Sequence, residues 1–316
     1  MSDPATLLTE PRIKLVARLR PLAGTRFQPT GFPDLGHATY PSPVDGSRLL
    51  LVESPQSMAN RLEGTLWDDA TQEPVRVIRS LPYIRVFDKD GLYLTSSRTE
   101  SHRLASAYVK DAAYEGVNGT QVILDRLGLE KQRPIDHARV HRSIFELDPL
   151  CLVHGVFFAD EKWPGQPKIS RAVTAFVEAA GVQEAYSGGV RFDNVSNKGD
   201  KETARKTAKE GYGNVPFSRT EFVAASIEAS FVLDVSQIRR YALEPLEREL
   251  LLSIALFEIR SLLDSGLRLR TACDLEVEDI RGDRPSGFEL PELSVIEGWV
   301  QDRLGDARPS LHGVYG

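Results

Sequence analysis

The start of one helix is the feature that most constrains how this chain folds. Ser54 is a good N-cap residue, and Pro55 suits the first position of a helix. Met58 and Leu62 then recur at helical spacing, which predicts an amphipathic helix. The apolar run Leu49–Val52 comes just before and is typical of a buried strand. A strand that leads directly into a core-packed helix is therefore expected.

The other face of this helix is polar and surrounds its first turn. Gln56, Ser57, Asn60 and Arg61 fall together there, and none of them is acidic. Free backbone N–H groups and the positive end of the helix dipole favour a phosphate at such a position. A plain solvated helix face would give the same pattern, so the sequence alone leaves both interpretations open.

A basic strand and a long loop precede the helix. Residues 13–20 alternate between apolar and basic, which predicts a half-buried strand whose exposed face carries Arg18 and Arg20. The loop over 21–47 is rich in glycine and proline, and Arg26 lies near its start. Long ordered loops are often functional. We expect Arg18, Arg20 and Arg26 to line the same groove as the helix start.

The charge of the chain is unevenly distributed. Residues 274–306 hold ten acids against three arginines, a net charge of −7, whereas the whole chain carries −6. The remainder therefore carries +1, and its positive charge gathers at 11–33 and in a second cluster within the glycine-rich segment 187–221. That second cluster consists of Lys198, Lys201, Arg205, Lys206 and Lys209.

The coarse element pattern favours an α+β fold. After the first helix we expect a β-hairpin at 83–95, a buried strand at 150–158, a helix or strand at 172–181, strands near 221–235, a helix at 245–263 and a strand at 267–272. Two helices on one face of an antiparallel sheet form the split-βαβ pattern of RNA-recognition modules. One elaborated domain over residues 1–316 fits this order.

Catalytic and metal motifs give little support for an enzyme. The sequence has no GxxxxGK[ST], and His137 with His141 lacks the glutamate and the third ligand of a zinc site. Asp34 and Asp160 imitate the carboxylates of a metal-dependent nuclease, at an unfavourably wide spacing. We therefore expect no catalytic residue, no metal and no cofactor.

Cysteine usage and hydropathy indicate the compartment. Cys151 and Cys273 lie far apart, which predicts free buried thiols. The longest uncharged apolar run, at 150–159, has about ten residues, half of the roughly 20 that a membrane helix needs. We expect a cytoplasmic protein without a membrane partner.

Several longer segments resemble a known family. They are Arg26-Phe-Gln-Pro-Thr-Gly-Phe-Pro-Asp-Leu-Gly36, Leu51-Val-Glu-Ser-Pro-Gln-Ser-Met-Ala-Asn-Arg-Leu-Glu63, Ser187-Gly-Gly-Val190, Lys209-Glu-Gly-Tyr-Gly-Asn-Val-Pro216 with Arg219-Thr-Glu221, and Leu267-Arg-Leu-Arg-Thr-Ala-Cys-Asp-Leu275. Together they resemble the backbone subunit of type I-G (formerly I-U) CRISPR Cascade, the Csb-one branch of the Cas-seven RAMP superfamily. The resemblance runs from about Ile13 to Leu275.

The resemblance implies an architecture and a set of partners. It implies an RRM-like palm, with a finger-like insertion over 96–150 and a thumb hairpin over 187–221; residues 276–316 are left as an acidic, peripheral tail. It also implies a non-catalytic subunit that oligomerises on CRISPR RNA as a helical filament beside other Cascade subunits. Such a subunit supports target DNA recognition through the guide in antiviral defence.

The resemblance and the residue pattern together give a set of expected RNA contacts. These are Arg18, Arg20, Arg26, Gln28, Gln56, Ser57, Asn60, Arg61, Lys198, Lys201, Arg205, Lys206, Asn214 and Arg219. They would hold phosphate and sugar and leave the guide bases free to pair. Two alternatives remain open, namely a metal-dependent nuclease of the same RAMP fold and a general single-strand binding protein.

Overall fold

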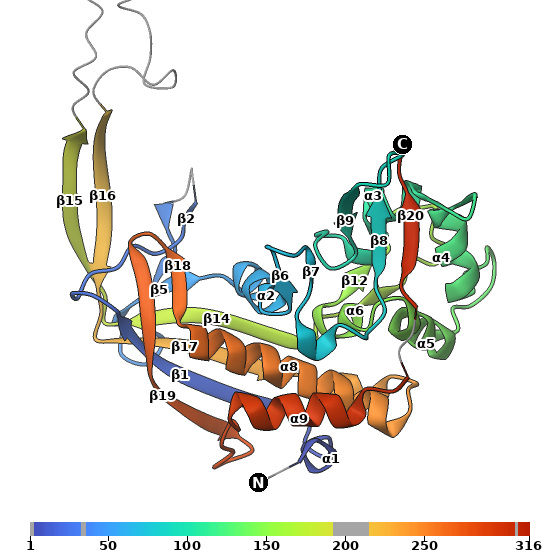
Figure 1. Ribbon diagram of the computed structural model, residues 1–316. Helices are drawn as coiled ribbons and strands as arrows, with labels where there is room; N and C mark the ends of the chain where they lie inside the picture. Colours follow the sequence, from blue (N-terminus) through green and yellow to red (C-terminus); the bar gives the residue numbers. More distant parts are fainter. Residues whose placement is uncertain (1–2, 33–35, 192–214, 307–308) are drawn as a thin grey trace, which may run out of the picture.

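A large antiparallel sheet is the main structural element of the molecule. Figure 1 shows the computed structural model, which describes residues 3–32, 36–191, 215–306 and 309–316. The sheet has seven strands in the order β18-β19-β1-β17-β14-β5-β4. In chain order they are β1 (Ile13–Pro21), β4 (Thr39–Pro41), β5 (Arg48–Glu53), β14 (Val173–Ala180), β17 (Ser226–Leu233), β18 (Leu267–Arg270) and β19 (Cys273–Arg284).

Apolar residues alternate along the strands of this sheet, so that one of its faces packs against the core. Leu15 pairs with Phe231, and Ala17 pairs with Ala229, so the buried residues of β1 and β17 point the same way. Two helices cover that face, α2 (Pro55–Gly64) and the long α8 (Pro245–Ser265), together with the short α1 (Pro4–Leu7) and α7 (Val235–Arg240). Helix α9 (Leu293–Arg303) packs on α8. The mixed helix-and-sheet architecture expected from the sequence is confirmed.

Both main helices begin and end where local chemistry requires. The Ser54 side chain accepts a bond from the Ser57 N–H group, so the expected cap of α2 is confirmed. At the start of α8, Glu244 and Glu247 form a capping box. Gly266 follows α8 with φ at 76°, a conformation that side chains rarely adopt.

A smaller sheet forms a second part of the molecule, on the right in Figure 1. Its order is β11-β10-β20-β8-β9, with β20 parallel to β8. Its strands are β8 (Ile84–Phe87), β9 (Tyr93–Ser96), β10 (Ala113–Tyr114), β11 (Val117–Asn118) and β20 (Leu311–Val314). Around it lie α3 (Ala107–Asp111), α4 (Gly119–Leu127), α5 (His137–Leu147), α6 (Leu150–His154), and the short turns η1 (Arg76–Ile78) and η2 (Arg103–Ala105).

A two-stranded hairpin extends from the other end of the large sheet (Figure 1). Strand β15 (Gln183–Arg191) pairs antiparallel with β16 (Val215–Val223), in a register that sets Ser187 opposite Arg219. Three further pairs are short: β2 (Gly31–Phe32) with β3 (Gly36–His37), β6 (Trp67–Asp68) with β7 (Glu73–Pro74), and β12 (Val156–Phe157) with β13 (Lys168–Ile169). The expected hairpin arms are present, and the segment between them lies outside the described residues.

The structure corrects the strand expected at 150–158. Residues Leu150–His154 form α6 instead, and only Val156–Phe157 is extended. Asp148 accepts a bond from the Leu150 N–H group at 3.2 Å, which favours the helical turn. Gly155 then takes φ at 81°, where an added Cβ would lie 2.7 Å from the Ile169 carbonyl oxygen. An uninterrupted apolar run does not distinguish a buried helix from a strand.

The segment expected as a peripheral acidic tail over 276–316 is built into both sheets. Most of β19 lies within it, and this part pairs with β1 at seven register positions, while β20 pairs with β8 in the smaller sheet. Helix α9, which lies between β19 and β20 in the sequence, packs on α8. Three of the segment's acids, Glu276, Glu278 and Asp283, are ion-pair partners for basic residues of β1, which a count of net charge does not reveal.

Candidate nucleic-acid interface

The loop after β1 joins the base of the hairpin to the large sheet. The Gln28 N–H group donates to the Ala272 carbonyl at 2.7 Å, and that of Thr30 donates to a β5 carbonyl at 3.1 Å. Phe27 is buried and exchanges two backbone bonds with Phe222 of β16, at 2.9 and 2.8 Å. Segments from four distant parts of the sequence therefore meet beside the start of α2.

A buried carboxylate lies at the centre of this meeting point. Glu53 is the last residue of β5, and its side chain is only 2% exposed. It accepts bonds from the Arg270 guanidinium and from the Thr30 hydroxyl, the latter at 3.2 Å. The Arg61 guanidinium lies 3.9 Å away. Two guanidinium groups thus share one carboxylate, so this cluster keeps a net charge of +1.

Arg61 connects α2 to β18. Its guanidinium donates to the backbone carbonyls of Arg268 at 3.2 Å and Leu269 at 2.6 Å. Its side chain remains 27% exposed. The sequence predicts a phosphate contact for Arg61, which stays a prediction; what the structure shows is that Arg61 fixes the helix to the neighbouring strand.

The rest of the polar helix face lies where a ligand can reach it. Gln56 and Asn60 are exposed, whereas Ser57 is half-buried and its N–H group is bonded to the Ser54 hydroxyl at 3.3 Å. The first turn contains no acidic residue. The start of α2 therefore offers amide side chains and the positive end of a ten-residue helix.

Arg18 and Arg20 do not join this group. Leu19 faces the core under the helices, so its neighbours on β1 point to the opposite face of the sheet. There Arg18 lies 3.3 Å from Glu278, and Arg20 lies 2.6 Å from Glu276. The expected groove shared with the helix start is not formed, and the basic strand face is compensated by β19.

The remaining expected contacts divide into two sets. Arg26 is exposed and forms an ion pair with Glu221 of β16 at 3.1 Å, while Gln28 is half-buried beside the β18–β19 turn. Arg219 belongs to β16. The others lie outside the described residues: Lys198, Lys201, Arg205, Lys206 and Asn214.

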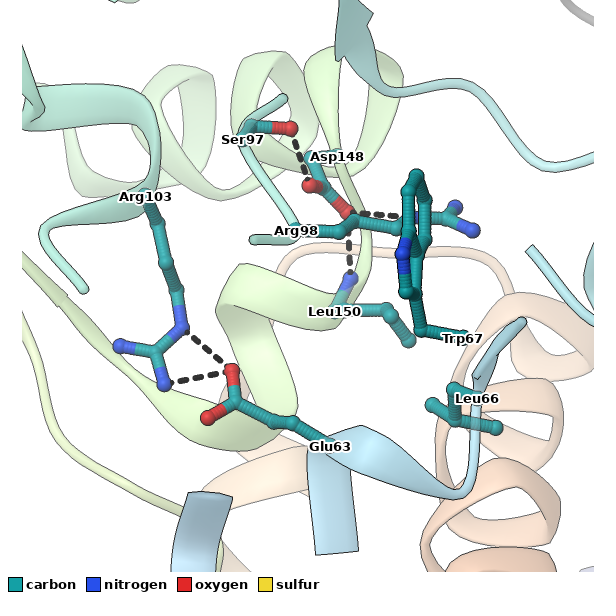
Figure 2. Close-up of a pocket in the computed structure, with 8 residues that line it drawn as sticks. All are labelled: Glu63, Leu66, Trp67, Ser97, Arg98, Arg103, Asp148 and Leu150. Carbon is teal, nitrogen blue, oxygen red and sulfur yellow. Dashed lines mark hydrogen bonds and ion pairs between the residues drawn. The ribbon is translucent and has the colours of Figure 1, made fainter. Parts of the chain in front are cut away.

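A second polar cluster lies at the far end of α2 (Figure 2). Arg98 and Asp148 are almost fully buried and lie 3.6 Å apart, and the Ser97 hydroxyl donates to Asp148 at 2.5 Å. Arg103 donates two bonds to one oxygen of Glu63, at 2.9 and 2.6 Å. Burial raises the pKa of Asp148, and Arg98 opposes that rise. The free space is about 10 Å³, roughly one water position. The cluster therefore ties α2 to the smaller-sheet region and is not a ligand pocket.

The motifs weighed for catalysis are dispersed. His137 and His141 lie on α5 with ring centroids 6.4 Å apart, and His141 packs on Tyr241. Asp160 accepts a bond from the Lys162 N–H group, and Asp34 lies outside the described residues. Within the described ranges, no group of three or more His, Cys, Asp or Glu side chains is arranged to hold a metal ion. Across those same ranges, no helix is long and apolar enough to span a bilayer.

A family model covers more than half of the chain. Residues 13–184 match the family described as CRISPR-associated protein GSU0053. The chain belongs to this CRISPR-associated family. The matched region includes Glu53 and the whole of α2, whereas Arg270 lies beyond it. No curated protein matches the chain in sequence.

Two solved structures match the chain at low sequence identity. One is a chain of a CRISPR RNA-guided surveillance complex in a pre-nicking state, with 11% identity and a TM-score of 0.46, covering 86% of this chain and 75% of that one. Another is Csc2 of Thermofilum pendens, with 12% identity and a TM-score of 0.34, covering 93% and 76%. Both scores lie below 0.5, so we infer nothing from these two likenesses.

Sequence reasoning missed three residues of the central cluster, namely Thr30, Glu53 and Arg270. Each lies within or beside a segment that already attracted attention, and Arg270 is part of an alternating Leu-Arg-Leu-Arg strand. A signal was present in Glu53, an acid directly after the apolar run Leu49–Val52 and next to a helix N-cap. Its partners lie 23 and 217 positions away, which local patterns do not reveal.

Proposed function

We propose that this protein is a non-catalytic backbone subunit that binds CRISPR RNA and oligomerises along it in a type I-G surveillance complex of the Cas-seven group. One observation carries the proposal. The segments around Arg26, Glu53 and Arg270, each singled out in the sequence, converge beside the first turn of α2, which contains no acid. That convergence leaves accessible amides and a net positive cluster at the base of a projecting hairpin.

The chemistry of this surface suits a phosphate backbone. A subunit repeated along an RNA needs contacts to phosphate and sugar that ignore the sequence, because the guide bases must remain free to pair with target DNA. Gln56 and Asn60 are exposed hydrogen-bonding side chains, and the helix dipole adds positive potential. One copy covers few phosphates, so affinity accumulates as copies add along the guide.

The strand order supports an RRM-like palm. The four strands β19-β1-β17-β14 are antiparallel neighbours, with α2 between β1 and β14 in sequence and α8 between β17 and β19. This is the order of a split βαβ motif. In this proposal the β15–β16 hairpin with residues 187–221 serves as the thumb, and residues 96–150 serve as the finger-like region.

The helix start offers a direct test of RNA binding. Gln56→Glu and Asn60→Asp place a negative charge on exposed side chains of almost unchanged shape. Binding of CRISPR RNA by the full-length chain is measured by filter binding across a salt series, and we expect both variants to bind more weakly. Gln301→Glu, an exposed glutamine on α9, serves as the matched control. Equal affinity in the wild type, Gln56→Glu, Asn60→Asp and the control would contradict the proposal.

The thumb is tested by deleting residues 198–209. We expect the shortened chain to remain stable as a monomer and to assemble poorly on guide RNA, measured by size-exclusion chromatography with partner subunits. Full-length complexes with normal target binding would exclude the thumb role.

The two rival functions give different results. A nuclease of the same fold predicts Mg²⁺-dependent cleavage of guide or target that is lost in Asp160→Ala or Asp34→Ala. A general single-strand binder predicts equal affinity for CRISPR RNA and for unrelated RNA when partner subunits are present. We expect no cleavage and a preference for CRISPR RNA.

A further inference from the structure

A surface groove lies between the β12–β13 pair and the η2 turn, away from the start of α2. It encloses about 550 Å³ of free space. Its lining includes His102, Arg103, Phe157, Lys168 and Arg171. In the part of the chain that the structure describes, no carboxylate lines it. The groove is therefore basic within a chain whose overall charge is negative.

An exposed aromatic ring lies in this groove. Phe157 is 47% exposed, although it belongs to a strand whose neighbour Val156 is buried. It pairs across the strands with Lys168, whose Nζ atom lies 5.5 Å from the ring centroid. Val156 and its partner Ile169 fill the core side, so Phe157 and Lys168 share the open side. The ring is thus held on a paired backbone and remains accessible.

The cations beside this ring differ from those of β1. Arg18 and Arg20 form ion pairs with acids of β19. By contrast, Lys168 and Arg171 form no ion pair with any residue in the described ranges. Unpaired cations attract a polyanion without first having to leave an acidic partner.

Together these features fit a nucleotide in a single strand. Such strands bind where a positively charged groove follows the backbone and an aromatic side chain stacks on a base. A base on the free face of Phe157 would leave its phosphates within reach of Lys168 and Arg171. A duplex does not fit this arrangement, because its bases already stack on one another.

We propose that this groove binds an unpaired nucleotide of single-stranded RNA or DNA, with the base stacked on Phe157 and its two flanking phosphates held one by Lys168 and the other by Arg171. This site is separate from the start of α2. The proposal rests on the proposed function and extends it. It provides a second contact for a strand that the backbone subunit carries, either the guide or the target.

A fluorescent base reports stacking directly. The full-length chain is titrated with single strands of one sequence that contain 2-aminopurine, made as RNA and as DNA. We expect fluorescence to be quenched by the wild-type protein and by Phe157→Trp, and quenching to be lost in Phe157→Leu and Phe157→Ala. The strand that is quenched identifies the source, guide for RNA and target for DNA. Equal quenching by Phe157→Leu and wild type would overturn the proposal.

The phosphate contacts are tested by salt dependence. Phe157→Ala should weaken binding about five- to 150-fold, as loss of one stacked base implies. Lys168→Ala with Arg171→Ala should lower the slope of log affinity against log salt by about 1.4, at about 0.7 for each phosphate of a single strand. Lys131→Ala and Leu246→Ala, which remove an exposed cation and an exposed apolar side chain elsewhere, should change neither quantity.

The two proposals fail in different ways. If Gln56→Glu weakens binding while all groove variants bind like wild type, the groove proposal is wrong and the proposed function stands. If the groove variants lose binding but CRISPR RNA and unrelated RNA bind equally, the CRISPR-specific function is wrong. Absence of any binding by the wild-type chain would overturn both. Thermal unfolding of each variant confirms that it is folded.

Discussion

The buried carboxylate of Glu53 is bonded to the guanidinium of Arg270, a residue 217 positions away in the sequence. The bond joins the end of β5 to β18, two strands that are separated by four others in the large sheet. Thr30, in the loop after β1, is hydrogen-bonded to both residues, and the Arg61 guanidinium approaches Glu53 from α2. One ion pair therefore fixes the relative positions of the loop, the helix start and the strand.

Replacing Glu53 with glutamine tests this tie. Glu53→Gln keeps the shape but leaves Arg61 and Arg270 without a carboxylate. We expect the free energy of unfolding to fall by about 1.5–3 kcal/mol, the usual value of hydrogen bonds to charged groups. Urea denaturation measures the change. Glu278→Gln, which removes the exposed partner of Arg18, should cost at most about 1 kcal/mol. Equal losses in the two variants would contradict the role of Glu53.

Arg61 is expected to act both on the fold and on RNA. Arg61→Ala should lower RNA affinity uniformly across sequences and reduce the salt slope by about 0.7, as loss of one phosphate contact to a single strand implies. It should also reduce stability, because two bonds to β18 carbonyls are lost. Arg61→Lys keeps the charge and should restore most of the salt slope. A changed sequence preference with an unchanged slope would exclude a phosphate contact.

The position of Arg20 on the far face of the sheet yields a discriminating pair of variants. Arg20→Ala should leave RNA binding unchanged and cost about 0–1 kcal/mol of stability, because its pair with Glu276 is exposed. Arg26→Ala, beside the loop and the hairpin base, should weaken RNA binding. Salt-dependent binding and urea denaturation are measured for both. A loss of RNA binding in Arg20→Ala would show that both sheet faces contact the nucleic acid.

A buried histidine–glutamate pair should make stability depend on pH. His154 and Glu258 lie 2.8 Å apart with no exposed side-chain surface. Burial lowers the pKa of His154, but Glu258 and Glu63 together outweigh this effect, so that pKa lies above its ordinary 6.5; burial raises the pKa of Glu258. Both groups therefore hold protons more tightly in the folded state. Their stabilisation is present below the unfolded pKa and is lost as pH rises through the folded pKa.

We therefore expect the free energy of unfolding to fall as pH rises above about 4.3, the ordinary pKa of glutamate, and to fall further above about 6.5, that of histidine. His154→Gln should flatten this dependence, measured by urea denaturation on either side of neutrality. His141 provides a control of opposite sign, because burial lowers its pKa and its contribution grows as pH rises. Identical pH profiles for wild type and His154→Gln would contradict the expectation.

Local chemistry made several elements predictable. The cap at Ser54, the alternation of β1, the Asp-Gly turn before β9 and the end of α8 at Gly266 each depend on residues within a few positions. The secondary structure of the apolar run at 150–158 was harder to predict, because buried helices and buried strands have the same composition. Helix α8 is also buried on all sides over Glu249–Ile259, where every residue is buried, whereas Leu246 in its first turn is 58% exposed.

The sequence by itself determined which residues carry positive charge, where α2 begins, and that this helix start is free of acids. Only the tertiary structure decided which cations remain available. Arg18 and Arg20 form ion pairs with acids of β19, and Arg61 is bound to β18. Lys168 and Arg171 line the same groove as Phe157, with no carboxylate among the described residues that line it. The reason is physical: periodicity reports neighbours along one element, whereas ion pairing depends on strands and helices that fold together from distant positions.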